Sequence, residues 1–555
     1  MKKSPVVWVI RRIKRRIPAI FLLMLTQIAN ALLSVYFALG TRSVIDCAVD
    51  GDTQTFLLAC EKQACIIAGI LLTSALLRHF RERLRADLEL DWKRSMLHGL
   101  LHGDYAGVSA YHSGELLNRL NNDVNRVNDG VLNIVPNAAS MVTRLVAAIV
   151  VLGTLDARFT LVVLALGVAV LAATALIRRR LKDLNKRVSA HDGKVSSFLQ
   201  EIMEKLLMVQ TMDVSDEVER RADVLLLDRY AIQRKRKNIS LLSNICISMM
   251  YYGAGFVALC WCAWQMLHGN MSFGSLTAVT QLVNQLQTPF VNLSGVMPQY
   301  IAMLASAERL MELDEIQGEP APRGEDPAEV YGRMDAICAE DLSFAYDRDA
   351  VLSNARFTLP KGAFAVITGP SGIGKSTLLK LLLGVFRPSG GNLYLACGQE
   401  KLLLDRSTRR MFAYVPQGNL LLSGTVRENL LIVRPDATDA ELEKAVYVSA
   451  MDEFLPQLPM GLDTPLGESG AGLSEGQAQR LAIARAVLGG APVLLLDECT
   501  SALDPETEQT VLSRLHSLPD RTCIAVTHRP AAVAICDWQL QVGDGKIQAV
   551  CTRKD

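Results

Sequence analysis

One short run of residues carries most of the chemistry that this sequence predicts. It fits the pattern G-x-x-x-x-G-K-[ST], follows a short β-type stretch and precedes a leucine-rich helical pattern. The run consists of Gly369, Pro370, Ser371, Gly372, Ile373, Gly374, Lys375, Ser376 and Thr377. Its glycines let the backbone curl so that N–H groups point at phosphate oxygens. Lys375 adds a positive charge for the outer phosphates, and the Ser376 hydroxyl suits Mg²⁺, so the run predicts a site for ATP with Mg²⁺.

Further motifs follow this run in a fixed order. They are Tyr-Val-Pro-Gln, Leu-Ser-Glu-Gly-Gln, a hydrophobic strand that ends in Asp-Glu, Ser-Ala-Leu-Asp and Thr-His. The residues in them that suit nucleotide chemistry are Gln417, Ser474, Gly476, Gln477, Asp497, Glu498, Asp504 and His528. In this order and spacing, the segment from about Met334 to Val550 resembles the nucleotide-binding domain of an ABC transporter. As a set, these motifs are much more specific than the first run alone.

The resemblance implies roles for these residues in ATP hydrolysis. Asp497 ends a hydrophobic strand, which presents its carboxylate to Mg²⁺ with little freedom, and Gln417 senses the Mg²⁺ and the water. Glu498 polarises the attacking water as general base, and His528 contacts the γ-phosphate. Tyr346, in Phe-Ala-Tyr, is expected to stack on adenine; a tyrosine that is simply buried is the alternative.

The resemblance also implies that one chain cannot complete an ATP site. Ser474 and Gly476 belong to the family's signature, which reaches the γ-phosphate bound to the opposite subunit, so a dimer of half-transporters is expected. Glu475 stands where the family most often has glycine, and a carboxylate there is tolerable if it points to solvent rather than to the triphosphate. Because Glu498 is present, a homodimer with two active sites is favoured, although the motifs also fit a heterodimer with a degenerate partner.

The composition divides the chain into two parts. Of its 555 residues 50% are hydrophobic and 21% are charged, as in a chain that joins a membrane domain to a soluble enzyme. Six apolar stretches are long enough, or nearly so, to cross a bilayer, which takes about 20 residues each. They lie at about 17–40, 63–77, 134–155, 160–177, 241–267 and 275–303. The net charge of +1 gives no reason to expect a nucleic-acid partner.

Basic residues indicate how these spans are oriented. Residues 1–16 carry basic side chains and no acidic one, and further basic clusters follow the second and fourth spans. The positive-inside rule therefore places both termini and the two long loops in the cytoplasm. We expect a multi-pass protein of the plasma (inner) membrane with a cytoplasmic ATPase domain. The apolar residues within 1–16 also suit a helix that lies along the inner leaflet.

The two long loops are expected to be helices that continue beyond the membrane, because structureless loops of that length are unusual. They resemble the intracellular loops of six-span ABC exporters, with coupling loops at Tyr111–Leu116 and near Val209–Asp216. The expected fold is a membrane α-helical bundle of six helices extended into the cytosol, joined to an α/β P-loop ATPase domain of ABC type. The predicted boundaries are 1–16 for the basic segment, 17–312 for the membrane domain, 313–333 for the linker and 334–555 for the ATPase domain.

Polar residues within the spans suggest where a substrate is held. Six of them lie in one arc of about 100° on span six. They are Gln281, Asn284, Gln285, Thr288, Asn292 and Gln299. This face is expected to line a translocation cavity, and hydrogen bonding between helices alone is the alternative. Arg144, a charge in span three, either binds an anionic group of the substrate or lies at the inner interface and snorkels.

These patterns predict an ATP-driven exporter or flippase that works by alternating access. A nucleotide-gated channel or regulatory subunit is a competing class, and the presence of Glu498 and His528 argues against it because gating alone does not require turnover. One half of an obligate heterodimeric exporter is a further alternative. The six spans exclude a soluble ATPase that acts on protein or nucleic acid. The transported substrate is not identified by the sequence.

Overall fold

The computed structural model describes residues 4–316, 318, 319, 324–346, 349–418, 421–467, 470 and 472–552. The side chains of residues 166, 168–182, 243, 246, 247, 250, 251, 287–295 and 297 lie outside this description. The chain divides into two compact units. Met1–His98 and Ser113–Glu315 form the helical unit, and Gly99–His112 and Ile316–Asp555 form the α/β unit. We describe each unit by itself.

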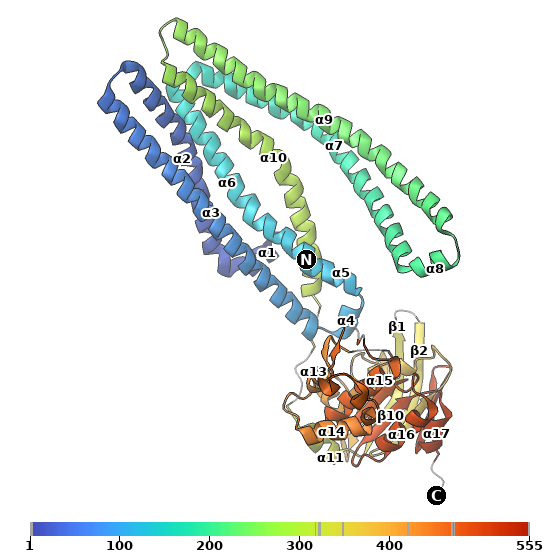
Figure 1. Cartoon of the computed structure of the whole chain (residues 1–555). Helices are drawn as coiled ribbons and strands as arrows, with labels where there is room; N and C mark the ends of the chain where they lie inside the picture. The colour runs from blue at the N-terminus through green and yellow to red at the C-terminus, as the bar shows by residue number, and fades with distance from the viewer. Residues whose placement is uncertain are drawn as a thin grey trace. The chain divides into compact units, whose positions relative to one another are not determined.

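Six long helices, one for each predicted span, dominate the helical unit (Figure 1). They are α2 (Ile17–Asp50), α3 (Thr53–His102), α6 (Val124–Leu155), α7 (Ala157–Glu204), α9 (Ser215–Leu267) and α10 (Phe273–Asp314). Shorter elements are α1 (Pro5–Ile13), η1 (Lys14–Arg16), α5 (Ser113–Asn118), η2 (Arg119–Asp123) and α8 (Leu206–Thr211). In Figure 1, α7 and α9 run side by side as a long hairpin with α8 at its turn.

Length and apolar composition qualify three helical segments of the described chain to cross a membrane. These are Pro5–Asp50, Thr53–His102 and Ser113–Leu155, and a shorter apolar stretch covers Tyr252–Leu267. The other long helices, α7, α9 and α10, contain side chains that lie outside the described set. The long helices are continuous through the loops that we expected to be helical, because no helix-breaking turn interrupts α3 before His102 or α7 before Glu204.

Parts of α2, α6, α9 and α10 and the start of α7 pack into one apolar core. Leu152, Phe159 and Leu282 are among its fully buried side chains. Ala148 and Ala258 are also fully buried, and small residues of this kind let helices approach closely in a membrane. The bundle is therefore held by close packing as well as by the bilayer.

A buried polar network joins η2 to the last turns of α10. Asp123, which is 1% exposed, accepts hydrogen bonds from Ser306 Oγ at 2.9 Å and from Arg309 Nε at 2.8 Å. Arg119 pairs with Glu312 at 2.9 Å and donates to the carbonyl of Arg309 at 2.6 Å. These contacts fix the register of α10 against the base of α6, since a shift of one turn would leave buried charges without partners.

The basic N-terminal segment is a helix that lies against α3 and the end of α10. The Trp8 indole donates to Asp314 Oδ2 at 2.9 Å, and its ring lies 5.2 Å from that of Trp92. On the other side of α1, Val7 and Ile10 are exposed. This division of faces suits the interfacial helix that the sequence suggested.

The described strands of the α/β unit form two sheets and one separate two-stranded pair. The larger has the strand order β12-β11-β3-β10-β9-β6, in which β12 pairs antiparallel and the other neighbours pair parallel. The smaller is antiparallel, with the order β2-β1-β4-β5. The strands of the larger sheet are β3 (Phe364–Thr368), β6 (Phe412–Val415), β9 (Val493–Asp497), β10 (Thr522–Val526), β11 (Trp538–Gly543) and β12 (Lys546–Cys551). Those of the smaller sheet are β1 (Ala336–Tyr346), β2 (Asp349–Pro360), β4 (Gly390–Cys397) and β5 (Glu400–Leu403), and β7 (Gly424–Thr425) pairs separately with β8 (Pro465–Leu466).

Helices complete the α/β unit around these strands. They are α4 (Tyr105–Ser109), α11 (Pro327–Arg333), α12 (Lys375–Leu382), α13 (Val426–Leu431), α14 (Asp439–Val448), α15 (Glu475–Leu488), α16 (Pro505–His516) and α17 (Pro530–Ile535). The strands β9 and β10 are buried throughout, which explains why each is an apolar run apart from one terminal residue, Asp497 in β9 and Thr522 in β10. Because β3, β9 and β10 are parallel neighbours, the residues that follow them gather at one edge of the sheet.

The predicted coupling loops fall at breaks between helices. Tyr111–Leu116 runs from the turn after α4 into α5, and Val209–Asp216 runs from α8 into the first turn of α9. The boundary between the two compact units falls inside the first predicted coupling loop, because residues up to His112 belong to the α/β unit and residues from Ser113 belong to the helical unit.

Candidate active site

The phosphate-binding loop connects β3 to α12 and ends in a backbone conformation that favours glycine. Gly374 has a φ of 107°, and a Cβ there would lie 2.3 Å from Val351 Cγ1. Lys375, which is 6% exposed, donates from Nζ to the carbonyls of Gly369 and Pro370, both at 2.8 Å. The lysine ammonium group therefore lies against the backbone at the start of the phosphate-binding loop, where its charge is available to a phosphate group.

Asp497, at the end of β9, is held by two hydroxyl groups. Ser376 Oγ donates to its Oδ1 at 3.1 Å, and Tyr414 Oη donates to its Oδ2 at 3.2 Å. Burial raises the pKa of Asp497, while these two hydrogen bonds act in the opposite direction. Burial also raises the pKa of Tyr414, as does the negative charge of Asp497, so the phenol keeps its proton and remains a donor.

The same residues suit a divalent cation. A serine hydroxyl and a carboxylate oxygen 3.1 Å apart are hard oxygen ligands, the type that Mg²⁺ takes together with water and phosphate oxygens. Asp497 is 2% exposed, so its charge is placed where water screens it little. The residues present therefore fit Mg²⁺.

Three predicted catalytic residues meet beside this pair. Gln417 Nε2 donates to Glu498 Oε2 at 2.8 Å, and His528 Nε2 lies 3.4 Å from Glu498 Oε1. Glu498 has a φ of 49°, an uncommon conformation for a residue with a side chain, and its N–H donates to the carbonyl of Val526 in β10 at 3.0 Å. The strand register thus turns the carboxylate out of the sheet edge towards the amide and the imidazole.

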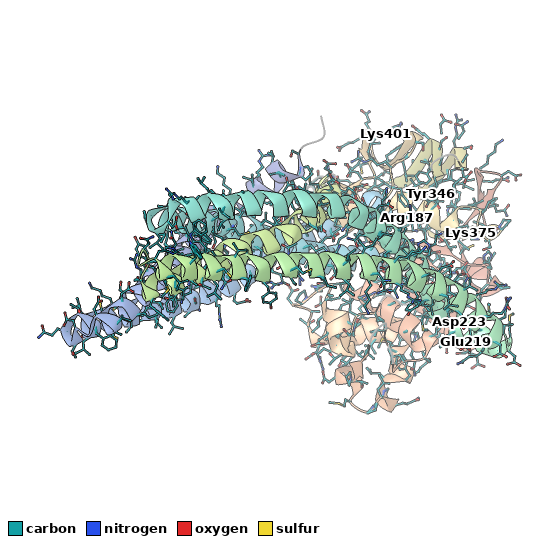
Figure 2. The ribbon with its side chains drawn as sticks, turned by 90° about the horizontal axis from the view of Figure 1, so that it is seen from above. Arg187, Glu219, Asp223, Tyr346, Lys375 and Lys401 are labelled. Atoms are coloured by element: carbon teal, nitrogen blue, oxygen red, sulfur yellow. The ribbon has the colours of Figure 1, made fainter. Side chains whose placement is uncertain are left out.

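Tyr346 ends β1 next to the phosphate-binding loop. Its hydroxyl lies 3.3 Å from Thr377 Oγ1, and its ring lies 4.9 Å from that of Phe344. The residue is 42% exposed, so part of its side chain is open to solvent. Simple burial, the alternative that the sequence left open, therefore does not describe this tyrosine. Figure 2 labels Tyr346 and Lys375, which both belong to the α/β unit.

The signature residues shape the start of α15. Ser474 Oγ accepts from the N–H of Gln477 at 3.2 Å, and Gln477 Oε1 accepts from the N–H of Ser474 at 2.9 Å, which is a capping box. A Cβ at Gly476 would lie 2.9 Å from the carbonyl of Ala502. Glu475 is exposed in the first turn, where an acidic side chain favours the helix.

Asp504 caps a second helix beside the signature. Its carboxylate accepts from the N–H of Thr507 at 3.0 Å at the start of α16, and this hydrogen bond lowers the pKa of Asp504. The Gln479 amide joins the two helix starts, because Nε2 donates to Ser501 Oγ and Oε1 accepts from the N–H of Ala502, each at 3.1 Å.

Sequence reasoning missed two residues that organise this region. The first is Tyr414, which lies three positions before Gln417 in the same motif. The second is Arg529, which follows His528 and donates to the carbonyl of Leu503 at 2.9 Å and to Glu508 at 3.2 Å. Both residues stand next to recognised motifs, which could have indicated a role in the site. Their hydrogen-bond partners could not be predicted, because they lie far away in the sequence.

The polar residues of the membrane spans are only partly brought together. Gln285 Nε2 donates to the carbonyl of Ser34 in α2 at 2.7 Å. Among the described side chains, Gln281 Oε1, Gln285 Oε1 and Arg144 Nε are buried without a hydrogen-bond partner. Asn284 is exposed. The side chains of Thr288 and Asn292 lie outside the described residues.

Comparison with known proteins places both units in one family. A family model described as the ABC transporter transmembrane region matches residues 17–290, and a second, described as ABC transporter, matches residues 352–501. The chain belongs to the ABC transporters. It is a half-transporter of the exporter type, which couples ATP hydrolysis to export, and this family functions as dimers. The predicted fold class is therefore confirmed.

Individual relatives agree with this assignment. The chain is 28% identical to the uncharacterized ABC transporter ATP-binding protein YwjA of Bacillus subtilis, over 95% of this chain and 92% of that protein. It is 29% identical to a putative multidrug export ATP-binding/permease protein of Staphylococcus aureus, over 80% and 77% respectively. It is 33% identical to the mitochondrial iron-sulfur clusters transporter atm1 of Aspergillus fumigatus, over 57% of this chain and 43% of that protein.

A solved structure resembles nearly the whole chain. It is a bacterial Atm1-family ABC exporter with ATP bound, which matches with a TM-score of 0.78 and 25% identity. The match covers 97% of this chain and 95% of that one. The helical unit and the α/β unit of this transporter are therefore both accounted for by one known architecture.

Proposed function

We propose that two copies of this chain form a homodimer in the plasma (inner) membrane that hydrolyses Mg²⁺-ATP at two sites and exports its substrate by alternating access. The contact of Glu498 with both Gln417 and His528 carries this proposal. A protein that only binds nucleotide has no need of a carboxylate held between an amide and an imidazole at the edge of the sheet. A nucleotide-gated channel or regulatory subunit is therefore the less favoured reading.

Each residue of the site has its own role in ATP hydrolysis. Lys375 turns from the two carbonyls of its loop to the outer phosphates, and the N–H groups of the loop support them. Ser376 and Asp497 hold Mg²⁺, which neutralises charge on the phosphate oxygens when it is bound. Glu498 takes the proton of the attacking water, while Gln417 and His528 fix the orientation of its two carboxylate oxygens.

The remaining assignments concern the nucleotide and the opposite subunit. Tyr346 stacks on adenine with the ring side that is left open. Ser474, Gly476 and Gln477 at the start of α15, and Asp504 at the start of α16, face the γ-phosphate bound to the partner subunit. The Glu475 side chain is exposed and takes no part in the capping box, so we assign the contact with the γ-phosphate to Ser474, Gly476 and Gln477 and not to Glu475.

Exposed apolar residues at the tip of the hairpin between α7 and α9 are consistent with a contact to a partner chain. Leu207 is 75% exposed and Met212 is 64% exposed, and Met208 beside them is also exposed. Apolar side chains gathered at one tip indicate a contact surface. This tip includes the start of the predicted second coupling loop, and we assign it to contact with the partner subunit.

The substrate cavity is proposed to lie beside α6 and α10. Arg144 lies 11 residues before the end of α6 at Leu155, which is about 16 Å along a helix. This places it near the middle of a hydrocarbon core about 30 Å thick, so the snorkelling alternative is the weaker one. Gln281 and Gln285, with buried oxygens that have no partner among the described residues, and Asn284, Thr288 and Asn292 complete the proposed lining.

The first test is vanadate-sensitive ATPase activity of the purified chain alone in lipid. Wild type is compared with Glu498→Gln, with and without a panel of drug-like cations and anionic amphiphiles. We expect hydrolysis by the wild type and a loss of about 100-fold or more in the variant. Activity without a second gene product supports the homodimer, and a compound that stimulates it identifies a substrate class. A folded wild type that binds ATP without hydrolysing it would overturn the homodimeric exporter in favour of a missing partner chain or a gated channel.

A further inference from the structure

Four aromatic rings in the α/β unit form a continuous cluster that reaches the proposed adenine site. Phe386, in the segment after α12, lies 5.5 Å from Tyr346 with the planes at 89° and 5.5 Å from Phe344 at 31°. Tyr105, the first residue of α4, lies 6.2 Å from Phe386 at 67°. These distances and mostly edge-to-face angles are those of favourable aromatic pairs. Phe386 thus contacts Tyr346 on one side and α4 on the other.

The segment that carries Tyr105 is fixed to the α/β unit by the chain that follows α10. Gly103 forms a β-bridge with Gly318, and the N–H of Glu319 donates to the carbonyl of His102 at 3.0 Å. Arg406 Nη1 reaches the same carbonyl of His102 at 3.4 Å. The segment that carries Tyr105 is therefore held within the α/β unit by backbone contacts with the residues that follow α10.

Glu319 also holds the junction, formed by residues 102–103 and 318–319, to the rest of the α/β unit. Its carboxylate is 8% exposed and pairs with Arg406 at 3.1 Å and with Arg409 at 2.9 Å. Arg409 also donates to the carbonyls of Leu383 and Gly384, each at 3.2 Å, just before Phe386 in the sequence. Any rearrangement of the junction thus acts on the backbone that carries Phe386 as well as on Tyr105.

The ring of Tyr346 has three supports, which differ in their freedom. Phe344 is a core residue of β1 that is 7% exposed, and Thr377 belongs to the phosphate-binding loop, so both are fixed. Phe386 is only half-buried and lies outside regular secondary structure. It is the support that also contacts Tyr105, so a movement of α4 changes the packing against Tyr346.

We propose that Phe386 is a positioning residue that makes the affinity for the adenine base depend on how Tyr105 and its segment are docked. The inference rests on the proposed role of Tyr346 in stacking on adenine and adds a route by which the chain between α3 and α5 acts on it. The base-dependent part of nucleotide binding belongs to Tyr346, whereas the phosphate-dependent part belongs to the loop around Lys375. We call this dependence of adenine affinity on Tyr105 and Phe386 the relay. The relay alters the base-dependent part of nucleotide binding and leaves the phosphate-dependent part unchanged.

The test separates these two parts by calorimetry on the full chain in lipid nanodiscs, without Mg²⁺ so that no turnover occurs. The ligands are ATP and inorganic tripolyphosphate, which has no base. Phe386→Leu is expected to raise the Kd for ATP about three- to fivefold, since an aromatic pair contributes about 0.5–1.5 kcal/mol. The Kd for tripolyphosphate stays the same. Tyr105→Leu shifts the ATP value in the same direction, and the double variant is no weaker than Phe386→Leu.

Matched variants make the outcome specific. Phe386→Tyr keeps the ring and restores the ATP affinity, and Tyr447→Leu, which removes an exposed ring that lies over Arg514 instead, changes neither ligand. If Phe386→Leu does not fold, the exposed Tyr105→Leu variant alone decides between ATP and tripolyphosphate. Equal losses for both ligands, or additive losses in the double variant, overturn the relay. A wild type that binds no ATP overturns the proposed function as well, whereas normal wild-type binding with unchanged variants overturns the relay alone.

Discussion

Tyr414 donates its phenolic hydroxyl to Asp497 Oδ2 across 3.2 Å, opposite the hydrogen bond that Ser376 makes to Oδ1. The tyrosine thereby fixes the rotation of a carboxylate that we assign to Mg²⁺. Tyr414→Phe keeps the ring and removes this one donor, so we expect the apparent Kd for the divalent ion to rise about five- to tenfold. Electron paramagnetic resonance of Mn²⁺ in the presence of ATP measures this directly, without turnover.

The Kd for ATP in the absence of metal serves as the control for Tyr414→Phe, and we expect it to be unchanged. Tyr394→Phe is a matched variant, because Tyr394 donates to Glu340 at 2.6 Å in the smaller sheet and not to Asp497. Unaltered Mn²⁺ binding by Tyr414→Phe would show that Asp497 is oriented by its strand alone.

Gly374→Ala is expected to weaken ATP binding about tenfold or more, because the residue has a φ of 107° and its new Cβ would meet Val351 Cγ1 at 2.3 Å. Gly372→Ala is the matched control in the same loop: its φ is 79°, but no heavy atom lies within 4 Å of the Cβ. Equilibrium binding of a fluorescent ATP analogue compares the two. The contact with Val351 accounts for the difference if Val351→Ala recovers part of the loss in Gly374→Ala and none in Gly372→Ala.

Asp123→Ala is expected to lower the free energy of unfolding by about 2–3 kcal/mol, since it leaves Arg309 and Ser306 without the buried partner they share. The estimate is below the full cost of breaking a buried pair because the Arg309 side chain is 38% exposed. Thermal unfolding in detergent measures the change. Asp183→Ala removes an exposed partner of Arg187, which Figure 2 labels on α7, and we expect little effect from it. Equal losses in the two variants would contradict a structural role for the buried network.

The sequence predicts the central strands of the α/β unit well because burial and chemistry coincide there. Apart from Asp497 and Thr522 at their ends, the strands β9 and β10 are apolar, and the residues to which we assign chemical roles, Asp497 and Glu498, come where β9 ends. The partner of Tyr414 is not predictable in the same way. Its hydroxyl reaches Asp497 because β6 pairs with β9 in a register that sets Tyr414 opposite Leu495, and no local pattern fixes that register.

Long-range packing explains the other features that the sequence does not show. Periodicity predicts that residues near the N-terminus can form an amphipathic helix, but not that Trp8 contacts Trp92 and Asp314. Likewise, the sequence predicts a linker at 313–333, but the pairing of Gly103 with Gly318 depends on where two distant helices end. Such contacts join segments that are far apart in the sequence, and they depend on the whole fold rather than on residue type.

Arg144 provides the sharpest test of the proposed substrate cavity. Its Nε is buried without a hydrogen-bond partner among the described residues, and a charge within the membrane is retained at a high cost in free energy. If the guanidinium binds an anionic group of the substrate, Arg144→Met should reduce stimulation of ATPase activity by anionic amphiphiles about tenfold and leave basal activity unchanged. Arg144→Lys should retain part of the response, and Arg158→Met, at the exposed start of α7, should retain all of it. An unchanged response in Arg144→Met, with stability lowered instead, would assign Arg144 to the packing of α6 rather than to the substrate.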